Sequence, residues 1–312
     1  MSAPVPSEIT VFAPASVGNI GPGFDVLGMA LAGLGDTVRA RAISGRGVVI
    51  REIRGDGDIL PKEAGKNTAG IAAARVLAML KVSSGVELSL EKNIPGNGLG
   101  SSAASAVAGG FAVNALFGSS LSKQELLLPC AAAEAAVSGG YFLDNTAASL
   151  LGGVNVANPV TRTAISLGGL PGALIVVATP RFKLLTARSR KVLPKRVPLP
   201  TMVANLSRAC AIVAAVGKGD VDLFGRSIVD LVVEPRRAPL IPGFLGVKRA
   251  ALKAGALGCS ISGAGSSVFA VTDDKPKADA IGDAMRRAFE RARLECVITV
   301  TTIDPKGARI IG

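Results

Sequence analysis

The segment from Ile94 to Ser105 has the residue types and order of an anion-binding loop. Its sequence, Ile-Pro-Gly-Asn-Gly-Leu-Gly-Ser-Ser-Ala-Ala-Ser, follows an alternating run over 86–91 that predicts a strand. Small and apolar residues over 103–117 predict a buried helix after it. Glycines let successive backbone N–H groups point inward, and a helix start adds free N–H donors and a positive dipole end. The stretch therefore predicts a phosphate site, with a serine-capped helix after an ordinary glycine turn as the alternative.

Two common phosphate motifs do not fit this segment. A P-loop needs Lys after its glycines, and Ala103 stands at the third glycine of the dinucleotide-binding pattern. The residues instead match Pro-x-x-Gly-Leu-Gly-Ser-Ser-Ala-Ala, which resembles the phosphate loop of the GHMP kinases. The resemblance implies that ATP contacts Asn67 and the loop residues Pro95, Gly96, Asn97, Gly98, Leu99, Gly100, Ser101, Ser102, Ala103 and Ala104.

Asn67 precedes a predicted helix over 68–80, for which Thr68 could serve as the cap. By the resemblance, Asn67 lies near the nucleotide base, and a role as a second capping residue is the alternative. Glu134 lies in an alanine-rich helix predicted over 123–136. Mg²⁺ prefers a carboxylate, water and phosphate oxygens. The resemblance assigns this metal to Glu134 and Ser102, whereas a lone acid on such a helix is otherwise a surface residue.

Four further segments resemble homoserine kinases, a family within the GHMP kinases. These are a glycine- and proline-rich loop over 14–25, an Asp-Asn pair after 138–143, Thr-x-x-x-Arg-x-x-Leu-Pro over 186–194, and Glu-Pro-x-Arg over 234–237. The loop over 262–267 resembles the third GHMP motif, with Ser266 where proline is usual. The alternative for the loop over 14–25 and for the Asp-Asn pair is a polar turn. The alternative is a solvated basic loop for 186–194 and a surface salt bridge for 234–237.

The resemblance also implies roles for these residues. The acceptor would be held by Asn19, Asp25, Asp144, Asn145, Arg190, Arg237 and Gly263, and the catalytic set would be Glu134, Asn145, Thr186 and Arg190. Arginines suit a carboxylate because a guanidinium donates two parallel hydrogen bonds. No residue qualifies as a general base. One departure concerns the acceptor: Phe142 stands shortly before the Asp-Asn pair, where the family usually has histidine.

The elements that must position these residues alternate between strands and helices. We expect strands at 8–13, 38–42 and 48–53, the last two paired, and later at 173–179, 258–261, 268–271 and 297–303. We expect further helices at about 201–216, 220–231, 246–256 and 275–294. This order predicts an α+β class. The resemblance implies the GHMP kinase fold, with an N-terminal ATP-binding domain like domain 2 of ribosomal protein S5 (1–168) and a ferredoxin-like C-terminal domain (169–312).

Composition excludes several function classes. The 312 residues contain no histidine, which removes Ser-His-Asp hydrolysis and histidine metal sites. Four cysteines without paired spacing indicate reduced core residues of a cytoplasmic protein, with the plastid stroma as the alternative for a mature form. No apolar run is expected to span a membrane. The net charge of +12 suits anionic substrates, and aromatic residues at 4% are few for a nucleic-acid partner.

The resemblance thus implies an ATP- and Mg²⁺-dependent kinase that phosphorylates the hydroxyl of L-homoserine in threonine biosynthesis. A GHMP kinase with another small-molecule acceptor, a non-catalytic ligand sensor of the same fold, and a basic RNA-binding protein are the alternatives. A homodimer is left open.

Overall fold

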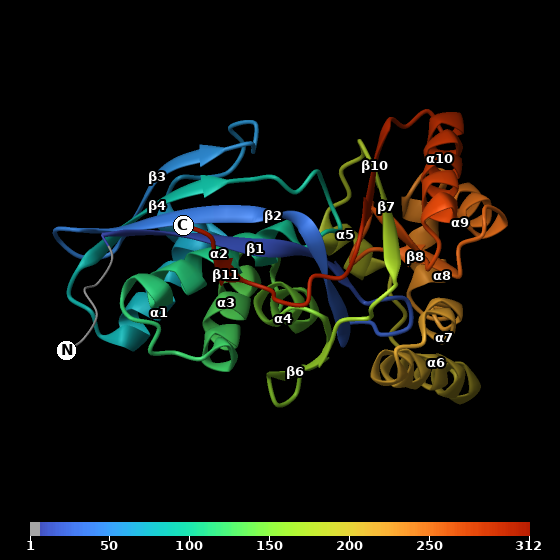
Figure 1. The fold of residues 1–312 in the computed structure, drawn as a ribbon, viewed down its shortest axis with the longest axis horizontal. Helices are drawn as coiled ribbons and strands as arrows, with labels where there is room; N and C mark the ends of the chain where they lie inside the picture. The colour runs from blue at the N-terminus through green and yellow to red at the C-terminus, as the bar shows by residue number, and fades with distance from the viewer. Residues whose placement is uncertain (1–6) are drawn as a thin grey trace.

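Two β-sheets, each covered by helices, lie side by side in the computed structural model, which describes residues 7–312 (Figure 1). The first sheet has the strand order β11-β1-β2-β4-β3, and β5 and β6 extend it from β2. Its strands are β1 Glu8–Gly18, β2 Leu27–Ile43, β3 Val48–Arg54, β4 Gly85–Glu91, β5 Val154–Asn158, β6 Thr163–Gly168 and β11 Arg309–Ile310. The last strand of the chain therefore belongs to the first sheet.

The second sheet is antiparallel and has the order β10-β7-β9-β8. Its strands are β7 Leu174–Pro180, β8 Gly258–Ile261, β9 Val268–Thr272 and β10 Cys296–Thr301. These four agree with the predicted strands to within two residues. The α+β class is confirmed, whereas the boundary between 168 and 169 stays a prediction.

Helices cover one face of the first sheet and both sides of the second (Figure 1). The helices on the first sheet are α1 Thr68–Leu80, α2 Ser101–Leu116, α3 Lys123–Ser138 and α4 Leu143–Leu151. The later helices are α5 Thr186–Lys191, α6 Leu199–Lys218, α7 Val221–Arg226, α8 Glu234–Arg237, α9 Phe244–Lys253 and α10 Lys275–Arg291. Two short 3₁₀ turns, η1 Ala64–Lys66 and η2 Ala238–Leu240, precede α1 and α9.

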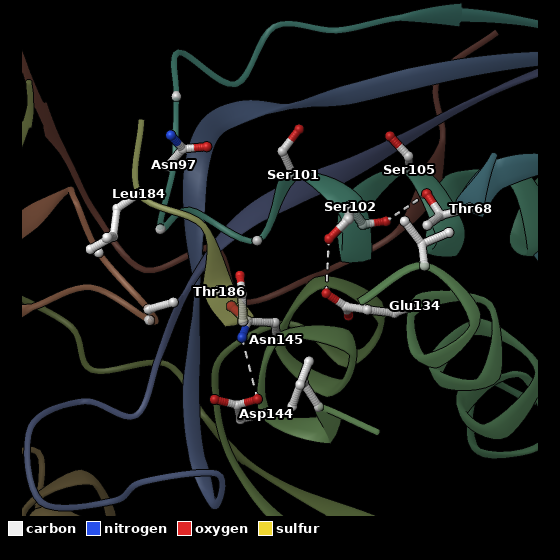
Figure 2. A pocket seen from close by; sticks show the side chains of 18 of the residues that line it. Thr68, Asn97, Ser101, Ser102, Ser105, Glu134, Asp144, Asn145, Leu184 and Thr186 are labelled. Carbon is white, nitrogen blue, oxygen red and sulfur yellow. Dashed lines mark hydrogen bonds between the residues drawn. The ribbon is translucent and has the colours of Figure 1, made fainter. Parts of the chain in front are cut away.

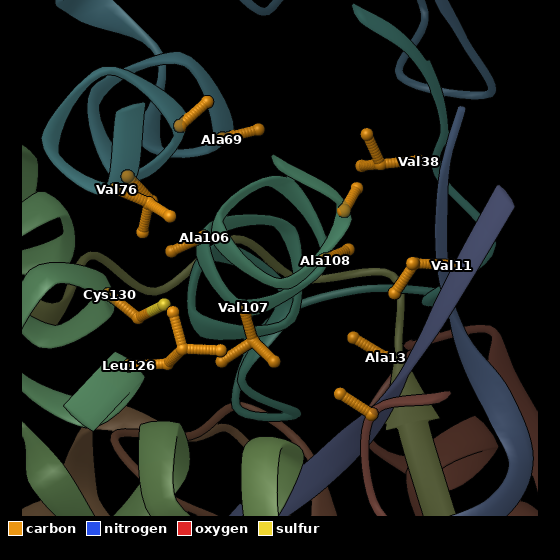
Figure 3. Packing of buried hydrophobic residues seen from close by; sticks show 14 of the residues in the cluster. Val11, Ala13, Val38, Ala69, Val76, Ala106, Val107, Ala108, Leu126 and Cys130 are labelled. Atoms are coloured by element: carbon orange, nitrogen blue, oxygen red, sulfur yellow. The ribbon is translucent and has the colours of Figure 1, made fainter. Parts of the chain in front are cut away.

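Helix α2 is the centre of the first core (Figure 3). Ala106, Val107 and Ala108 are fully buried and face, in turn, α1, α3 and the strands β1 and β2. Small residues all round the helix let its neighbours approach closely, and a helix that is apolar all round is buried. The expected buried helix over 103–117 is confirmed.

Three expectations for the sheets and helices were wrong. The strand over 48–53 pairs with β4 in parallel, not with β2, because β4 lies between them. Strand β1 continues past Pro14 to Gly18. Its pairing with β2 shifts register between Pro14 and Ser16, and a proline is tolerated where the ladder is interrupted. Helix α7 ends at Arg226, with Ser227 as its C-cap, and a turn separates it from α8. In this turn the Asp230 carboxylate accepts the N–H groups of residues 232–234.

Helix α6 lies at the edge of the second domain (Figure 1). Contrary to expectation, it is long and apolar enough to cross a membrane by length and composition, and 17% of the relevant 18-residue window is buried. The Asn205 side chain donates to the Pro22 carbonyl (3.0 Å) and accepts from the Leu231 N–H (2.9 Å). These bonds tie α6 to two loops of the same chain.

Candidate active site

The loop between β4 and α2 has the backbone that the glycine spacing predicts. Gly96, Gly98 and Gly100 have φ of 152°, 90° and 63°, values that side chains disfavour. Gly100 is the N-cap of α2 and provides no side-chain cap. The first N–H groups of α2 are therefore left for a ligand, as in other anion sites at helix starts.

A loop of the second domain, Ser262–Ser267, holds this phosphate loop in place. The Ser262 hydroxyl donates to the Gly98 carbonyl (2.5 Å), and the Ser267 hydroxyl donates to the Asn97 carbonyl (2.7 Å). A Cβ on Gly98 would lie 2.6 Å from the Ser262 carbonyl oxygen. The expected glycine loop over 262–267 thus packs against the phosphate loop, and the two domains meet at this contact.

Glu134, on α3, points at the first turn of α2 (Figure 2). Its carboxylate accepts hydrogen bonds from the Ser102 hydroxyl (2.8 Å) and the Thr146 hydroxyl (3.3 Å). The side chain is buried, so the alternative of a surface acid does not hold. Burial raises the pKa of Glu134 to about 7, with a smaller contribution from Asp144. A cation bound beside this buried carboxylate would stabilise its ionised form.

Asn67 has the capping role, and Thr68 is the first residue of α1. The Asn67 Oδ1 accepts the Ala69 N–H (3.0 Å), and Nδ2 donates to the Pro61 carbonyl (3.0 Å). Thr68 instead donates to the Ser102 carbonyl (3.1 Å) and so links α1 to the phosphate loop (Figure 2). Asn67 also lines the cavity described below, so its role as a helix cap is compatible with the predicted position near a nucleotide base.

The polar residues of the loop over 19–25 are hydrogen-bonded to one another and to α4. Asn19 Oδ1 accepts the Asp25 N–H (3.1 Å), and Asn19 Nδ2 donates to the Gly263 carbonyl (2.8 Å). Asp144 accepts the Asn19 N–H (3.2 Å). Asp144 is buried, which, with the nearby Asp25, raises its pKa to about 6. Asn19 and Asp25 have φ of 71° and 58°, so this loop is also in a strained conformation.

The two predicted arginines come from α5 and α8 and lie in the same pocket. Arg190 pairs with Asp25, with Nη2 2.6 Å from Oδ1. Arg237 is 2% exposed and donates from Nη1 to the Gly263 carbonyl (2.8 Å) and from Nε to the Ser189 carbonyl (3.3 Å). Burial and the nearby Arg190 lower the pKa of Arg237 to about 10. Neither arginine is the exposed member of a surface salt bridge.

One cavity of about 350 Å³ connects these groups. The predicted site residues that line it are Asn19, Asp25, Asn67, Gly96, Asn97, Gly98, Gly100, Ser101, Ser102, Glu134, Asp144, Asn145, Thr186, Arg190, Arg237 and Gly263. Leu99, Ala103 and Ala104 are fully buried beneath the loop, and exposed Pro95 is not in the lining. Contacts of these four with ATP stay a prediction.

Lys92 lines the cavity and was not among the residues predicted from the sequence. It forms an ion pair with Asp36, which is 1% exposed, and donates to the Ser105 hydroxyl (2.5 Å) and the Ser101 carbonyl (3.1 Å). Its position in the sequence, directly after the predicted strand and shortly before the glycines, could have indicated that it lies near the loop. The side chain adds a positive charge beside the start of α2.

The fold and the site together define a small-molecule kinase, with the glycine-rich loop and the Glu134 carboxylate at one end of the cavity and two arginines with two aspartates at the other. Comparisons with known proteins agree. The model of the GHMP kinases N terminal domain matches residues 67–153, and that of the GHMP kinases C terminal domain matches residues 212–291. The crystal structure of L. major mevalonate kinase shares the fold, with a TM-score of 0.74 at 18% identity over 98% of this chain and 99% of that chain.

Closer relatives are homoserine kinases. That of Chlorobaculum tepidum is 42% identical over 97% of this chain and 98% of its own length. The homoserine kinase of Arabidopsis thaliana is 43% identical over 99% of this chain and 86% of its own length. The crystal structure of homoserine kinase from Cytophaga hutchinsonii has a TM-score of 0.95 and 39% identity, and covers 100% of this chain and 99% of that chain. The chain belongs to the homoserine kinase family of the GHMP kinases.

Proposed function

We propose that the protein transfers the γ-phosphoryl group of ATP to the hydroxyl of L-homoserine, giving O-phospho-L-homoserine in threonine biosynthesis. The observation that carries this is the charge arrangement beside the phosphate loop. Two arginines and two aspartates, Arg190, Arg237, Asp25 and Asp144, line the same cavity. They complement the carboxylate and ammonium of an amino acid. A different acceptor or a non-catalytic sensor is not favoured by relatives that match over nearly the whole chain.

At the phosphate end, the chain provides positioning and neutralisation, which is most of what phosphoryl transfer requires. Backbone N–H groups of the loop over 96–102 would bind the phosphates. The hydrogen-bonded pair of Ser102 and Glu134 fits Mg²⁺, which is usually held by one or two carboxylates together with substrate phosphates. Bound there, the ion would neutralise charge on the phosphate oxygens.

At the acceptor end, the carboxylates would face the ammonium and the arginines the carboxylate of the amino acid. Asn19 and Asn145 would help to orient it. Asn145 accepts from the Ser16 hydroxyl (3.0 Å), and the preceding Asp144 accepts the Asn19 N–H (3.2 Å), which fixes both side chains on α4. We assign no general base and propose that the hydroxyl proton passes to the transferred phosphoryl group.

The test is ADP release from ATP and Mg²⁺ with homoserine, mevalonate, shikimate, pantoate and sugars as acceptors, with ³¹P NMR of the product. We expect homoserine to have the highest kcat/KM and to yield a phosphate monoester. A higher kcat/KM with any other acceptor would refute the assignment of the substrate.

Two further properties are proposals. A homodimer is supported by exposed apolar side chains along one helix, at Leu199, Met202, Val203 and Leu206 of α6. Sedimentation of the wild type against Leu206→Glu tests it, and an unchanged monomer in both would exclude this face. The proposed location is the cytoplasm, or the plastid stroma for a mature form, and the free cysteines suit either compartment.

A further inference from the structure

Arg190 has aromatic rings around it. Its Cζ lies 4.1 Å from the centroid of the Phe142 ring and 5.2 Å from that of Phe24. Phe24 is also 5.3 Å from Arg237 Cζ, so one ring serves both guanidinium groups. A cation within about 6 Å of a ring centroid is attracted by the negative face of the ring. Two like charges are thereby held in one pocket with an aromatic ring beside both.

Phe142 and Arg190 come from different parts of the chain, at the start of α4 and within α5 respectively. Phe142 is the N-cap of α4, and its carbonyl accepts the Thr146 hydroxyl (3.3 Å). The next residues of the same helix are Asp144 and Asn145, the proposed acceptor contacts. Arg190 lies on α5, in the second half of the chain. The stack therefore fixes an arginine of one domain against the acceptor helix of the other.

The stack leaves part of the guanidinium unused. Nη2 of Arg190 is paired with Asp25, whereas the buried Nε has no hydrogen-bond partner among residues 7–312. The Phe142 ring packs 4.1 Å from Cζ, and its negative face offsets part of the cost of this buried, unpaired N–H. Flexible arginines lose freedom when they bind, and a ring packed on the guanidinium face removes much of that freedom in advance.

We propose that Phe142 is a positioning residue that holds Arg190 by stacking, and that it keeps the part of the guanidinium that lines the cavity available to the acceptor's carboxylate. The phenyl ring thus has a function of its own at the position where the family usually has histidine. The inference rests on the proposed function for the identity of the acceptor, but not for the stack itself.

The variants separate the ring from its bulk. Phe142→Leu keeps an apolar side chain without a π face, and Phe142→Tyr keeps the face. Tyr141→Leu is the matched control, because Tyr141 stacks on Arg162 at 4.8 Å but does not line the cavity. We expect Phe142→Leu to raise the KM for homoserine about 3- to 30-fold with little change in the KM for ATP. Phe142→Tyr and Tyr141→Leu should stay within about 2-fold of the wild type.

A second readout needs no substrate. In protein with ¹⁵N-labelled arginine, the Arg190 Hε signal, assigned by its loss in Arg190→Lys, should be shifted upfield by the ring current. Phe142→Leu should remove this shift and Phe142→Tyr should keep it. An unmoved Hε signal in Phe142→Leu overturns the stack, and an unmoved homoserine KM overturns the positioning role. A wild type inactive on homoserine refutes the proposed function, while the Hε signal still decides the stack.

Discussion

Replacement of Glu134 by glutamine should stabilise the protein and at the same time inactivate it. The carboxylate is buried, and its pKa of about 7 in the folded chain compares with 4.5 for the free side chain. A difference of this size corresponds to about 3 kcal/mol between the protonated and ionised forms. Glutamine has nearly the same shape and no charge to desolvate, and its oxygen can still accept from the Ser102 hydroxyl.

The sign of the effect follows from proton binding. Between pH 4.5 and about 7, the folded state binds the proton that the unfolded state has released, so the free energy of unfolding falls as the pH rises. Above about pH 7 the folded protein bears the full free-energy cost of burying the ionised carboxylate, and below pH 4.5 this cost is absent. The free energy of unfolding of Glu134→Gln should therefore exceed that of the wild type by up to about 3 kcal/mol at pH 8 and by almost nothing at pH 4.

Urea unfolding without nucleotide or divalent cation measures this difference at both pH values. Glu290→Gln is the control, since Glu290 is exposed on α10 and should change stability by less than about 0.5 kcal/mol. Turnover of Glu134→Gln with saturating Mg²⁺ should fall on the order of 10²-fold or more. Equal stability of Glu134→Gln and wild type at pH 8, or wild-type turnover, would refute the reasoning.

Three other variants test the remaining parts of the site. Lys92→Met leaves Asp36 buried and unpaired, so urea unfolding should show a loss of about 3–5 kcal/mol that Asp36→Asn largely restores in the double variant; additive losses would contradict this. Gly98→Ala should lower kcat/KM for ATP at least about tenfold, because its φ is 90° and a backbone oxygen lies 2.6 Å from the new Cβ. Gly118→Ala, with φ 95° and open space, is its control and should keep kcat/KM. Arg237→Lys loses the planar fork and should raise the KM for homoserine far more than that for ATP; equal rises would place it on the triphosphate.

Local signals in the sequence predicted the structure of the glycine-rich loop and of the helix that follows it. The strand, the glycines and the start of α2 are consecutive in the chain, and the backbone conformation follows from residue type. The partner of Ser102 was found through resemblance, because 32 residues separate it from Glu134 and nothing local links them. The alanines around Glu134 gave no sign that its face would be buried.

Contacts between distant segments were not predictable from periodicity. The ion pair of Lys92 with Asp36 joins residues 56 positions apart in the chain. Phe142 and Arg190, which contact each other, lie in different domains. The sequence showed Phe142 only as a missing histidine, since a ring's function depends on what packs against it. The parallel pairing of β3 with β4 was likewise missed, because alternation identifies a strand but not its neighbour.

The position of β11 has a consequence for synthesis of the protein. Strand β1 is paired on one side by β2 and on the other by Arg309 and Ile310, and the Thr10 N–H donates to the Gly312 carbonyl (2.7 Å). Translation at about 5–20 residues per second separates the emergence of β1 and β11 by roughly 15–60 seconds. During that interval the edge of β1 is open to other strands. The N-terminal half is thus made first on the ribosome but completes its sheet only after β11 has been made.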